Sequence, residues 1–470
     1  MARTKIVATI GPASNSPETI RRMIAAGMRV ARVNFSHGNH EQHTKTVKML
    51  REVAESENKI LGILGDLQGP KLRLGHVKTG GIQLSLGEEV VLTPHRGQPA
   101  MIHMPHPDLI EVIEPGARLV IGDGEVEFTV AEKMGDALRC MTTVAGLLES
   151  RKGVNAPGTD LPISSITEKD KEDLKLVCQL ELDYVALSFV RTAADIQELR
   201  ELMKAEGADI PIIAKIEKSE AIEHLEEIRD AADGMMVARG DLGIEVQPQE
   251  VPLLQKRIIS TCNEVGKPVI TATQMLQSMV EHPRPTRAEA SDVANAILDG
   301  TDAVMLSGET ASGHYPVESV LMMKQISEII EGAFPYNEWR NRRQAEAAQS
   351  HTVTQAISAA CCDVAEQVGA RAIVSATMSG YTATQIARHR PPTPVMAVSP
   401  LERTRRKLSL VWGVECVLVP DFTNTDEMLE KTAAAMQRYN LNPGDKLVIT
   451  AGVPFGQQGQ TNLIQVHEIT

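Results

Sequence analysis

Eight short apolar runs, each followed by a stretch with helical spacing, constrain the fold of this chain more than any other feature. The runs cover residues 5–10, 29–35, 60–67, 183–189, 211–216, 234–238, 268–273 and 303–306. They are apolar on successive residues, which is typical of parallel strands buried on both faces. Eight strand–helix units in order predict a closed (β/α)₈ barrel of the TIM type, in the α/β class. A doubly wound open sheet is the structural alternative.

The alternation of strands and helices breaks once, after the third run. Between residues 74 and 163 the pattern is that of β-strands, at residues 82–86, 89–93, 119–121, 125–130 and 139–144. Polar and apolar side chains alternate over residues 125–130, and Gly122-Asp123-Gly124 supplies turn residues just before them. We therefore expect a small β domain at residues 74–163. Inserted at the carboxyl end of the barrel, it would lie over the mouth as a lid.

A second change of pattern follows the eighth unit. Residues 339–350 are polar and charged, as in a connector, and strand–helix alternation then resumes. The later predicted strands are residues 372–376, 395–398, 415–419, 446–450 and 463–468. A chain of 470 residues is long enough for several domains. We expect a barrel at residues 1–73 and 164–344, and a separate C-terminal α/β domain at residues 345–470.

Composition excludes some classes of function. The net charge of −13 and the aromatic content of 3% argue against a nucleic-acid-binding surface. Every apolar run is too short to span a bilayer, and the N-terminus lacks the apolar region of a signal peptide. We therefore expect a cytoplasmic protein that does not associate with membranes.

Functional residues of TIM-type barrels lie at the carboxyl ends of the strands. Charged and hydroxyl side chains gather at these ends, at Arg32, Asp66, Arg73, Ser188, Lys215, Glu217, Arg239, Asp241, Thr273, Ser307 and Glu309. Taken singly, a lysine or arginine at a strand end more often faces solvent than binds a ligand. Likewise, Ser-Gly-Glu-Thr at 307–310 could be only a helix N-terminal cap. Taken together, four cations and three carboxylates predict a magnesium-assisted phosphoryl-transfer site at one mouth. They are Arg32, Arg73, Lys215 and Arg239, with Asp66, Glu217 and Asp241.

The spacing within this set assigns roles. Glu217 and Asp241 end neighbouring strands, and two oxygen ligands completed by substrate and water are typical of Mg²⁺ sites. Lys215 precedes Glu217 by two residues, so both side chains lie on the same strand face. Lys215 can then neutralise charge on a transferred phosphoryl group or an enolate oxygen. The helix expected after Arg239-Gly240-Asp241 offers free N–H groups to a substrate carboxylate.

Four motifs in this order resemble the pyruvate kinase family. They are Asn34-Phe35-Ser36-His37-Gly38, Ala214-Lys215-Ile216-Glu217, Ala238-Arg239-Gly240-Asp241-Leu242-Gly243 and Met305-Leu306-Ser307-Gly308-Glu309-Thr310. The resemblance runs from Lys5 to the C-terminus and includes the lid and the C-terminal domain. It implies a glycolytic, allosterically regulated enzyme that transfers a phosphoryl group from phosphoenolpyruvate to ADP, giving pyruvate and ATP.

The resemblance also implies a role for each matching residue. Arg32 and Lys215 match the residues that bind the phosphate of phosphoenolpyruvate. Glu217 and Asp241 match the ligands of Mg²⁺ or Mn²⁺, and Gly240, Asp241 and Thr273 match the clamp for the carboxylate. The matches for ADP contacts are Pro12, Asn34, His37, Arg73 and, from the lid, Lys152. The enolpyruvate intermediate is protonated at carbon, and Thr273, Ser307 and Glu309 all stay open as members of the proton relay.

One residue departs from the better-known family pattern. Many members have a glutamate at the position of Lys71 and need K⁺, held by residues matching Asn34, Ser36, Asp66 and Leu67. With lysine here, the chain resembles the K⁺-independent branch, because an ammonium group supplies the charge of the ion. We expect activity without K⁺. The alternative is that Lys71 simply faces solvent.

The C-terminal domain resembles the family's regulatory domain. A phosphate-binding loop is expected at Thr377, Ser379, Gly380 and Thr382, where a strand leads into a helix. A plain loop with a helix cap is the alternative. Family members activated by fructose 1,6-bisphosphate usually have basic residues in the loop matching residues 452–459, which here contains no lysine or arginine, so the resemblance favours a sugar or nucleotide monophosphate over a bisphosphate. The resemblance further implies a homotetramer, and nothing in the sequence suggests an additional C-terminal module.

Two other functions remain open at this level. One is a non-catalytic sensor of phosphorylated metabolites on the same fold, which loss of Lys215, Glu217 or Asp241 would have favoured. The other is a different barrel enzyme acting on phosphoenolpyruvate or pyruvate, which needs neither the lid nor the C-terminal domain.

Overall fold

The computed structural model describes residues 2–97, 101–159, 163–347, 352–439, 441–453 and 461–469. Eight parallel strands close into a barrel, each hydrogen-bonded to the next. In order around the barrel they are β1 (Lys5–Thr9), β2 (Met28–Asn34), β3 (Gly62–Asp66), β12 (Tyr184–Leu187), β13 (Ile212–Ile216), β14 (Gly234–Ala238), β15 (Val269–Ala272) and β16 (Ala303–Leu306). The closed barrel is confirmed, and the open sheet is excluded.

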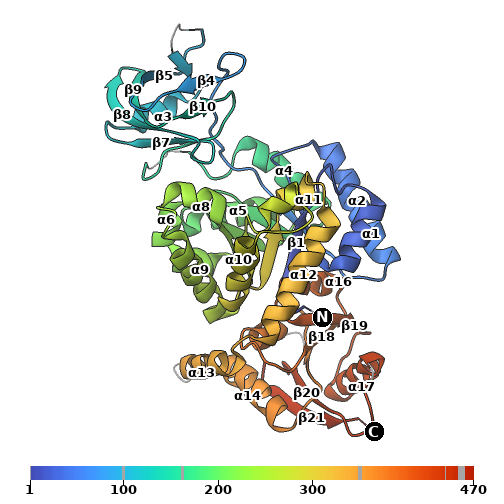
Figure 1. Ribbon diagram of the computed structural model, residues 1–470. Helices are drawn as coiled ribbons and strands as arrows, with labels where there is room; N and C mark the ends of the chain where they lie inside the picture. Colours follow the sequence, from blue (N-terminus) through green and yellow to red (C-terminus); the bar gives the residue numbers. More distant parts are fainter. Residues whose placement is uncertain are drawn as a thin grey trace.

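Helices surround this barrel (Figure 1). They are α1 (Pro17–Ala26), α2 (His40–Ser56), α4 (Glu168–Gln179), α5 (Ala193–Ala205), α6 (Ser219–Glu223), α7 (Leu225–Ala231), α8 (Arg239–Glu245), α9 (Val251–Val265), α10 (Arg287–Leu298), α11 (Gly308–Ala311) and α12 (Pro316–Gly332). A short 3₁₀ helix, η1 (Gln277–Val280), follows β15. Local sequence sets the helix starts. At α1, Pro17 occupies the first turn and the Ser16 side chain accepts the N–H of Thr19.

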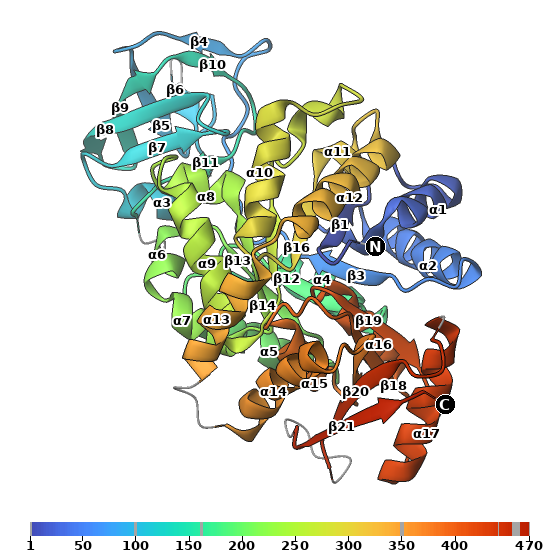
Figure 2. The same ribbon diagram turned by 60° about the horizontal axis from the view of Figure 1, so that its bottom comes forward.

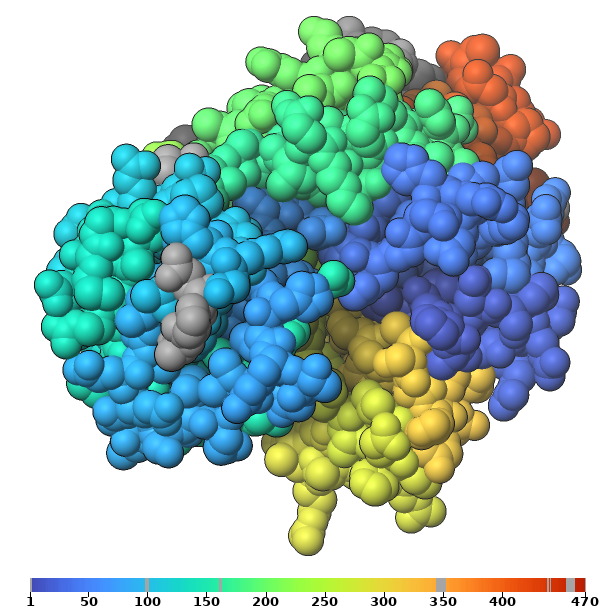
Figure 3. All heavy atoms as spheres, turned by 90° about the horizontal axis from the view of Figure 1, so that it is seen from above, coloured from blue at the N-terminus to red at the C-terminus, as the bar shows by residue number. Residues whose placement is uncertain are grey.

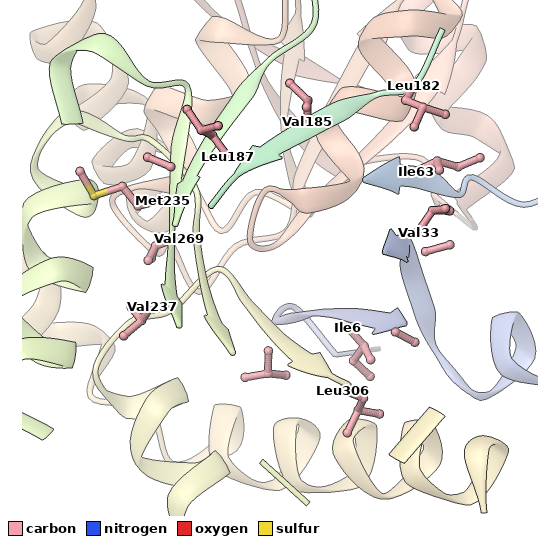
Figure 4. Close-up of a cluster of buried hydrophobic side chains, with 14 of the residues drawn as sticks. Ile6, Val33, Ile63, Leu182, Val185, Leu187, Met235, Val237, Val269 and Leu306 are labelled. Carbon is pink, nitrogen blue, oxygen red and sulfur yellow. The ribbon is translucent and has the colours of Figure 1, made fainter. Parts of the chain in front are cut away.

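The strands are buried on both faces, as their continuous apolar runs require. Alternate residues such as Val185 and Leu187 face outward and pack with the helices, and Figure 4 shows them with their neighbours from other strands. The residues between them, Tyr184 and Ala186, belong to the cluster inside the barrel. Strand β13 alternates in the same way. Ile213 faces the barrel interior, so Lys215, two residues further along, lies on the same inner face and closer to the mouth.

The inserted segment forms a separate β domain with its own core. Its main sheet orders β11 (Val154–Asn155), β7 (Arg118–Ile121), β8 (Val126–Met134), β9 (Ala137–Val144), β5 (Glu89–Thr93) and β6 (Met101–His103). A smaller sheet pairs β4 (Ile82–Leu84) with β10 (Gly146–Leu148), and α3 (Pro107–Val112) completes the domain. Figures 1 and 2 place it at the end of the barrel away from the C-terminal domain and next to α8, as expected for a lid.

The C-terminal domain lies at the opposite end of the barrel (Figure 1). Its sheet orders β19 (Val414–Leu418), β18 (Val395–Ser399), β17 (Ala372–Ala376), β20 (Lys446–Ala451) and β21 (Leu463–Glu468), the last antiparallel. Its helices are α14 (Val353–Gln367), α15 (Tyr381–Ala387), α16 (Glu402–Lys407) and α17 (Thr425–Met436), with two 3₁₀ turns, η2 (Leu408–Leu410) and η3 (Gln437–Tyr439). Leu410 is fully buried with residues of the barrel interior, so this domain closes the base of the barrel.

The segment predicted as a polar connector is largely a helix, α13 (Tyr336–Ala347). Trp339 and Arg343 on this helix are buried, and the Arg343 guanidinium lies 4.9 Å from the centroid of the Trp339 ring. The polar composition of this segment therefore gave no sign that it forms a packed helix between the barrel and the C-terminal domain.

We propose that the chain divides into domains at the limits stated in the sequence analysis. Among the described residues, none of the helices combines the length and apolar character needed to cross a membrane.

Candidate active site

Five side chains from four strand ends form a connected polar cluster at the barrel mouth. The Arg32 Nε donates to Asp66 Oδ2 at 2.6 Å. The Lys215 ammonium lies 2.8 Å from Glu217 Oε1 and 3.4 Å from Asp66 Oδ1. It also donates to the Ser188 hydroxyl at 2.7 Å. Figure 3 shows the mouth from above as a hollow bordered by the lid and by segments of the barrel rim.

Burial and charge set the protonation of this cluster. Burial opposes the charge on Lys215, but Asp66 and Glu217 outweigh it and raise the pKa of the ammonium above its ordinary value. Burial alone would also raise the pKa of Asp66, yet Lys215 and Arg32 hold it below its usual range. Burial raises the pKa of Glu217, and the like charge of Asp241 adds to this while Lys215 opposes it. The site therefore keeps Lys215 as a cation.

Glu217 and Asp241 have the properties of a divalent-cation site. Glu217 is buried, and Asp241 lies in the first turn of α8, near enough for its charge to act on Glu217. Two carboxylates that repel each other are stabilised by a shared cation. Among the described residues, no group of three or more metal-ligating side chains occurs. Because Mg²⁺ and Mn²⁺ prefer oxygen ligands, the two carboxylates fit either ion, with other ligands drawn from substrate and water.

The loop after β15 is strained where the carboxylate clamp is expected. Thr273 and Gln274 both have positive φ, of 66° and 53°. Such a conformation is unfavourable for a β-branched residue and is found where function requires it. The Thr273 hydroxyl oxygen accepts the N–H of Gly240 at 2.8 Å. The structure therefore places Thr273 beside Gly240, the residue before Asp241, at the end of β14, and a carboxylate clamp at this point stays a prediction.

Arg239 does not join the cations at the mouth, which corrects one prediction. Its guanidinium donates to the carbonyl oxygens of Ala272 and Thr273 at 3.2 and 2.8 Å and pairs with Asp292 at 2.7 Å. Helix α8 begins at Arg239, and this side chain runs along the rim toward β15. Arg239 thus holds the strained loop in place.

The three candidates for proton transfer have different surroundings. Glu309 is fully buried, and its two oxygens accept the N–H groups of Leu276 and Ser307 at 3.0 and 2.7 Å. This is the arrangement of a residue that fixes two loops. Ser307 and Thr273 are partly accessible at the mouth. The geometry therefore favours a hydroxyl over Glu309 as the group nearest the substrate.

The residues expected to contact ADP are spread over the barrel rim and the lid. Pro12 and His37 are exposed, and Asn34 is half-buried at the end of β2. Arg73 also does not reach the mouth cluster, because it lies in the segment at residues 67–73 that joins β3 to the lid, here called the hinge, and donates to the Arg151 carbonyl at 3.1 Å. Lys152 is tied to lid carboxylates, at 2.8 Å from Glu125 and 3.4 Å from Glu149.

Three oxygens of the family's K⁺ site, Asn34 Oδ1, Asp66 Oδ2 and the Leu67 carbonyl, already have donors within the chain. Asn34 Oδ1 accepts the N–H of Ser36 at 3.1 Å, and the Leu67 carbonyl accepts the Ser188 hydroxyl at 2.7 Å. Asp66 is paired as described above. Lys71 is exposed beside Gly153 at the hinge, and within the described chain it forms no ion pair.

The candidate effector loop is well ordered by its own hydrogen bonds. The Thr377 hydroxyl accepts the N–H of Gly380 at 3.0 Å, and Ser379 Oγ accepts the N–H of Tyr381 at 3.4 Å. Thr382 is buried, and its hydroxyl lies 2.8 Å from that of Thr461. The loop predicted to lack basic residues, 452–459, lies mostly outside the described residues, which stop at 453 and resume at 461.

Two residues of the site were not assigned a role from sequence. Ser188 was noted only as a strand-end residue, and Asp292, which holds Arg239, lies in the middle of α10. The strand-end position was a signal for Ser188. Nothing in the local pattern marks Asp292, because its partner comes from another strand–helix unit.

Comparisons with known proteins agree with this site. The family model described as pyruvate kinase, barrel domain, matches residues 1–320, and that described as pyruvate kinase, alpha/beta domain, matches residues 355–467. A pyruvate kinase of Geobacillus stearothermophilus is 46% identical over 100% of this chain and 80% of its own length. Pyruvate kinase 2 of a Synechocystis strain is 46% identical over 99% of this chain and 79% of its own length. A crystal structure of a pyruvate kinase from Cryptosporidium parvum superposes with a TM-score of 0.94 at 34% identity, covering 100% of this chain and 96% of that one.

Proposed function

Since this chain belongs to the pyruvate kinase family and transfers a phosphoryl group from phosphoenolpyruvate to ADP, we propose that its reaction centre is the cluster around Lys215. One observation carries this proposal. The Lys215 ammonium is held at the barrel mouth between Glu217, Asp66 and Ser188, beside the Arg32 guanidinium. Two fixed cations in a buried site are suited to a phosphoryl group that carries negative charge in the transition state.

The reaction divides into two steps. A β-phosphate oxygen of ADP attacks the phosphorus of phosphoenolpyruvate, and the bond from phosphorus to the enol oxygen breaks. Lys215 and Arg32 hold the phosphoryl oxygens and stabilise the enolate oxygen that is left. A proton then adds to the terminal carbon of enolpyruvate, giving pyruvate.

Other residues would orient the substrates. Glu217 and Asp241 would hold Mg²⁺ or Mn²⁺, which when bound stabilises charge on the phosphoryl oxygens. The N–H groups at the start of α8 and the Thr273 hydroxyl would bind the carboxylate of phosphoenolpyruvate, replacing the bond between Gly240 and Thr273. We place Thr273 and Ser307 at the proton relay, with Glu309 fixing the loops behind them. ADP would lie against Pro12, Asn34 and His37, and lid closure would bring Arg73 and Lys152 to its phosphates.

Activity is expected not to require K⁺. The proposal is supported by Lys71 at the hinge and by Asp66 Oδ2 and the Leu67 carbonyl oxygen, which have donors within the chain. Because Lys71 is exposed, it would reach the site only when the lid closes. In tetramethylammonium buffer with Mg²⁺, adding K⁺ should change kcat by less than about twofold.

Lys71→Glu is the matched variant for this test. Replacing the ammonium by a carboxylate should make activity depend on K⁺, with a stimulation of about tenfold or more. A strong K⁺ requirement in the unaltered enzyme would contradict the role given to Lys71.

Releasing Lys152 from its lid partners should improve ADP binding. The hydrogen bond that Lys152 donates to Glu125 raises the pKa of Lys152 and keeps its charge paired within the lid. Glu125→Gln removes one competing anion, so KM for ADP should fall by about twofold to fivefold while KM for phosphoenolpyruvate stays unchanged. The control is Glu132→Gln, which changes an exposed lid glutamate paired with Arg139 at 2.7 Å. Equal KM values for ADP in the two variants would exclude Lys152 as an ADP contact.

A phosphorylated metabolite is expected to bind the C-terminal domain at the loop of Thr377, Ser379, Gly380 and Thr382. Its hydroxyls and N–H groups suit one phosphate group. Calorimetric titration should show that AMP or ribose 5-phosphate binds better than fructose 1,6-bisphosphate. Ser379→Ala should weaken binding by about fivefold, whereas Ser399→Ala, at the end of β18, should not. Tighter binding of the bisphosphate would overturn this choice of effector.

The assembly and location of the protein follow from the same family membership. We propose a homotetramer formed through barrel and C-terminal contacts, located in the cytoplasm. Light scattering of the purified protein would test the tetramer, with a mass of about four times 51.1 kDa as the expected result.

A further inference from the structure

Ser188, which follows β12, makes a hydrogen-bond chain whose direction is fixed. The side chain is 2% exposed. Its hydroxyl donates to the Leu67 carbonyl oxygen at 2.7 Å, which uses its single proton. The lone pairs of the oxygen therefore accept, and Lys215 Nζ donates to them at 2.7 Å. Ser188 thus presents a neutral acceptor to the cation of the reaction centre.

The other two partners of Lys215 are carboxylates. The ammonium has three N–H donors, and within 3.4 Å it meets Ser188, Glu217 and Asp66. Glu217 Oε2 accepts the N–H of Phe189 at 2.8 Å, and Oε1 lies 2.8 Å from Lys215, so each oxygen of this carboxylate already has a donor. A divalent cation held by Glu217 would compete with the Lys215 ammonium for the same carboxylate. When a metal is bound, the hydrogen bond to the neutral Ser188 hydroxyl would therefore set the position of Lys215.

The backbone around Ser188 is held in a strained form. Phe189 has a φ of 55°, which is unfavourable for an aromatic residue and persists only where surrounding contacts enforce it. The Ser165 hydroxyl lies 2.9 Å from both the Phe189 carbonyl oxygen and Asp195 Oδ1 and contacts this backbone from one side. On the other side a Cβ added to Gly69 would lie 2.7 Å from the Phe189 ring and 3.0 Å from Ser188 Cβ, so glycine is required. This backbone conformation at Ser188 and Phe189 directs the Ser188 hydroxyl toward Lys215 and the Phe189 N–H toward Glu217.

We propose that Ser188 is a positioning residue, which anchors Lys215 on a neutral oxygen so that Glu217 is left available to the divalent cation. The proposal rests on the function proposed above. Without the hydroxyl, Lys215 keeps only carboxylate partners and moves closer to Glu217. Metal binding then weakens, and the ammonium is displaced from the phosphoryl group.

Ser188→Ala tests this, with Ser319→Ala as the matched control. Ser319 is fully buried in α12, and its hydroxyl also donates to a backbone carbonyl at 2.7 Å, that of Tyr315. Mn²⁺ binding to the free enzyme is titrated by electron paramagnetic resonance, and kcat and KM for ADP are measured separately. Ser188→Ala should weaken Mn²⁺ binding by about threefold to tenfold and lower kcat by about tenfold to hundredfold, with KM for ADP within about twofold. Ser319→Ala should leave all three unchanged.

A Mn²⁺ affinity or a kcat of Ser188→Ala equal to that of Ser319→Ala overturns the proposal. Thermal midpoints of the two variants serve as the check on folding. Ser188→Thr, which keeps the hydroxyl, should bind Mn²⁺ as tightly as the unaltered enzyme. A folded Ser188→Thr variant with weakened Mn²⁺ binding would also contradict the role proposed for Ser188. Because Mn²⁺ binding is measured without turnover, it distinguishes this result from a failure of the proposed function.

Discussion

Lys215→Met is expected to lower kcat by about 10³-fold or more, the effect of removing a fixed charge aimed at the developing negative charge. Methionine has nearly the length of the lysine stem, so packing of the partly buried side chain is retained. The loss is expected to fall on the transition state, because Arg32, held by Asp66 at 2.6 Å, would still bind the phosphate in the ground state in the proposed mechanism. Initial rates of pyruvate formation at saturating phosphoenolpyruvate and ADP give kcat directly.

Lys218→Met is the matched control for this variant. Lys218 lies three residues further along the same chain segment and forms an ion pair of 2.6 Å with Glu245, with both side chains at most 10% exposed. Its loss should lower stability, because a buried carboxylate is left unpaired, but should change kcat by less than about threefold. Similar losses of kcat in both variants would mean that Lys215 acts only through folding.

Arg390→Met is expected to lower the free energy of unfolding by about 3–5 kcal/mol, the effect of removing one partner of a buried ion pair. Arg390 belongs to the C-terminal domain and is 1% exposed. It pairs with Asp302 of the barrel at 3.1 Å and donates to the Gly300 carbonyl at 2.7 Å. Its guanidinium lies 4.6 Å from the centroid of the Trp412 ring. The substitution leaves Asp302 buried with part of its charge uncompensated.

Tryptophan fluorescence during urea unfolding measures this loss of stability, because both tryptophans lie beside Arg390. The chain has two tryptophans, and Arg390 lies 5.9 Å from the centroid of the other, Trp339. The control is Arg403→Met, since Arg403 pairs with Asp209 at 3.9 Å where both side chains are more than half exposed. That surface pair should contribute less than about 1 kcal/mol. Equal urea midpoints for the two variants would show that Arg390 does not hold the two domains together.

The barrel was predictable from sequence because its strands are buried on both faces. Continuous apolar runs located all eight strands, and the resumed alternation of strands and helices located the five strands of the C-terminal domain. The lid was predicted as a β domain, but β6, β10, β11 and α3 were missed. These strands have two or three residues each, too few for an alternating pattern, and their pairing partners define them. Helix α13 was missed because its sequence is polar and its buried face rests on Trp339 and Arg343.

Sequence predicted the positions of site residues where the two-residue period of a strand sets the face to which a side chain points. Lys215 and Glu217 share the inner face of one strand segment, so their contact at 2.8 Å followed from spacing. Arg239 was wrongly placed in the mouth, because a side chain at the start of a helix can turn along the rim. The hydrogen bond of Ser188 to Leu67 depends on two neighbouring strands, and sequence alone does not give the register between them.

The most direct test of the central claim is the stoichiometry of the reaction at this site. Purified enzyme is incubated with phosphoenolpyruvate, ADP and Mg²⁺ in K⁺-free buffer, and ³¹P spectra and pyruvate are followed together. We predict that one ATP and one pyruvate form for each phosphoenolpyruvate consumed, that nothing forms without ADP, and that Lys215→Met abolishes both products. Pyruvate formed without ATP, or no ADP-dependent reaction even with AMP or sugar phosphates added, would contradict the account.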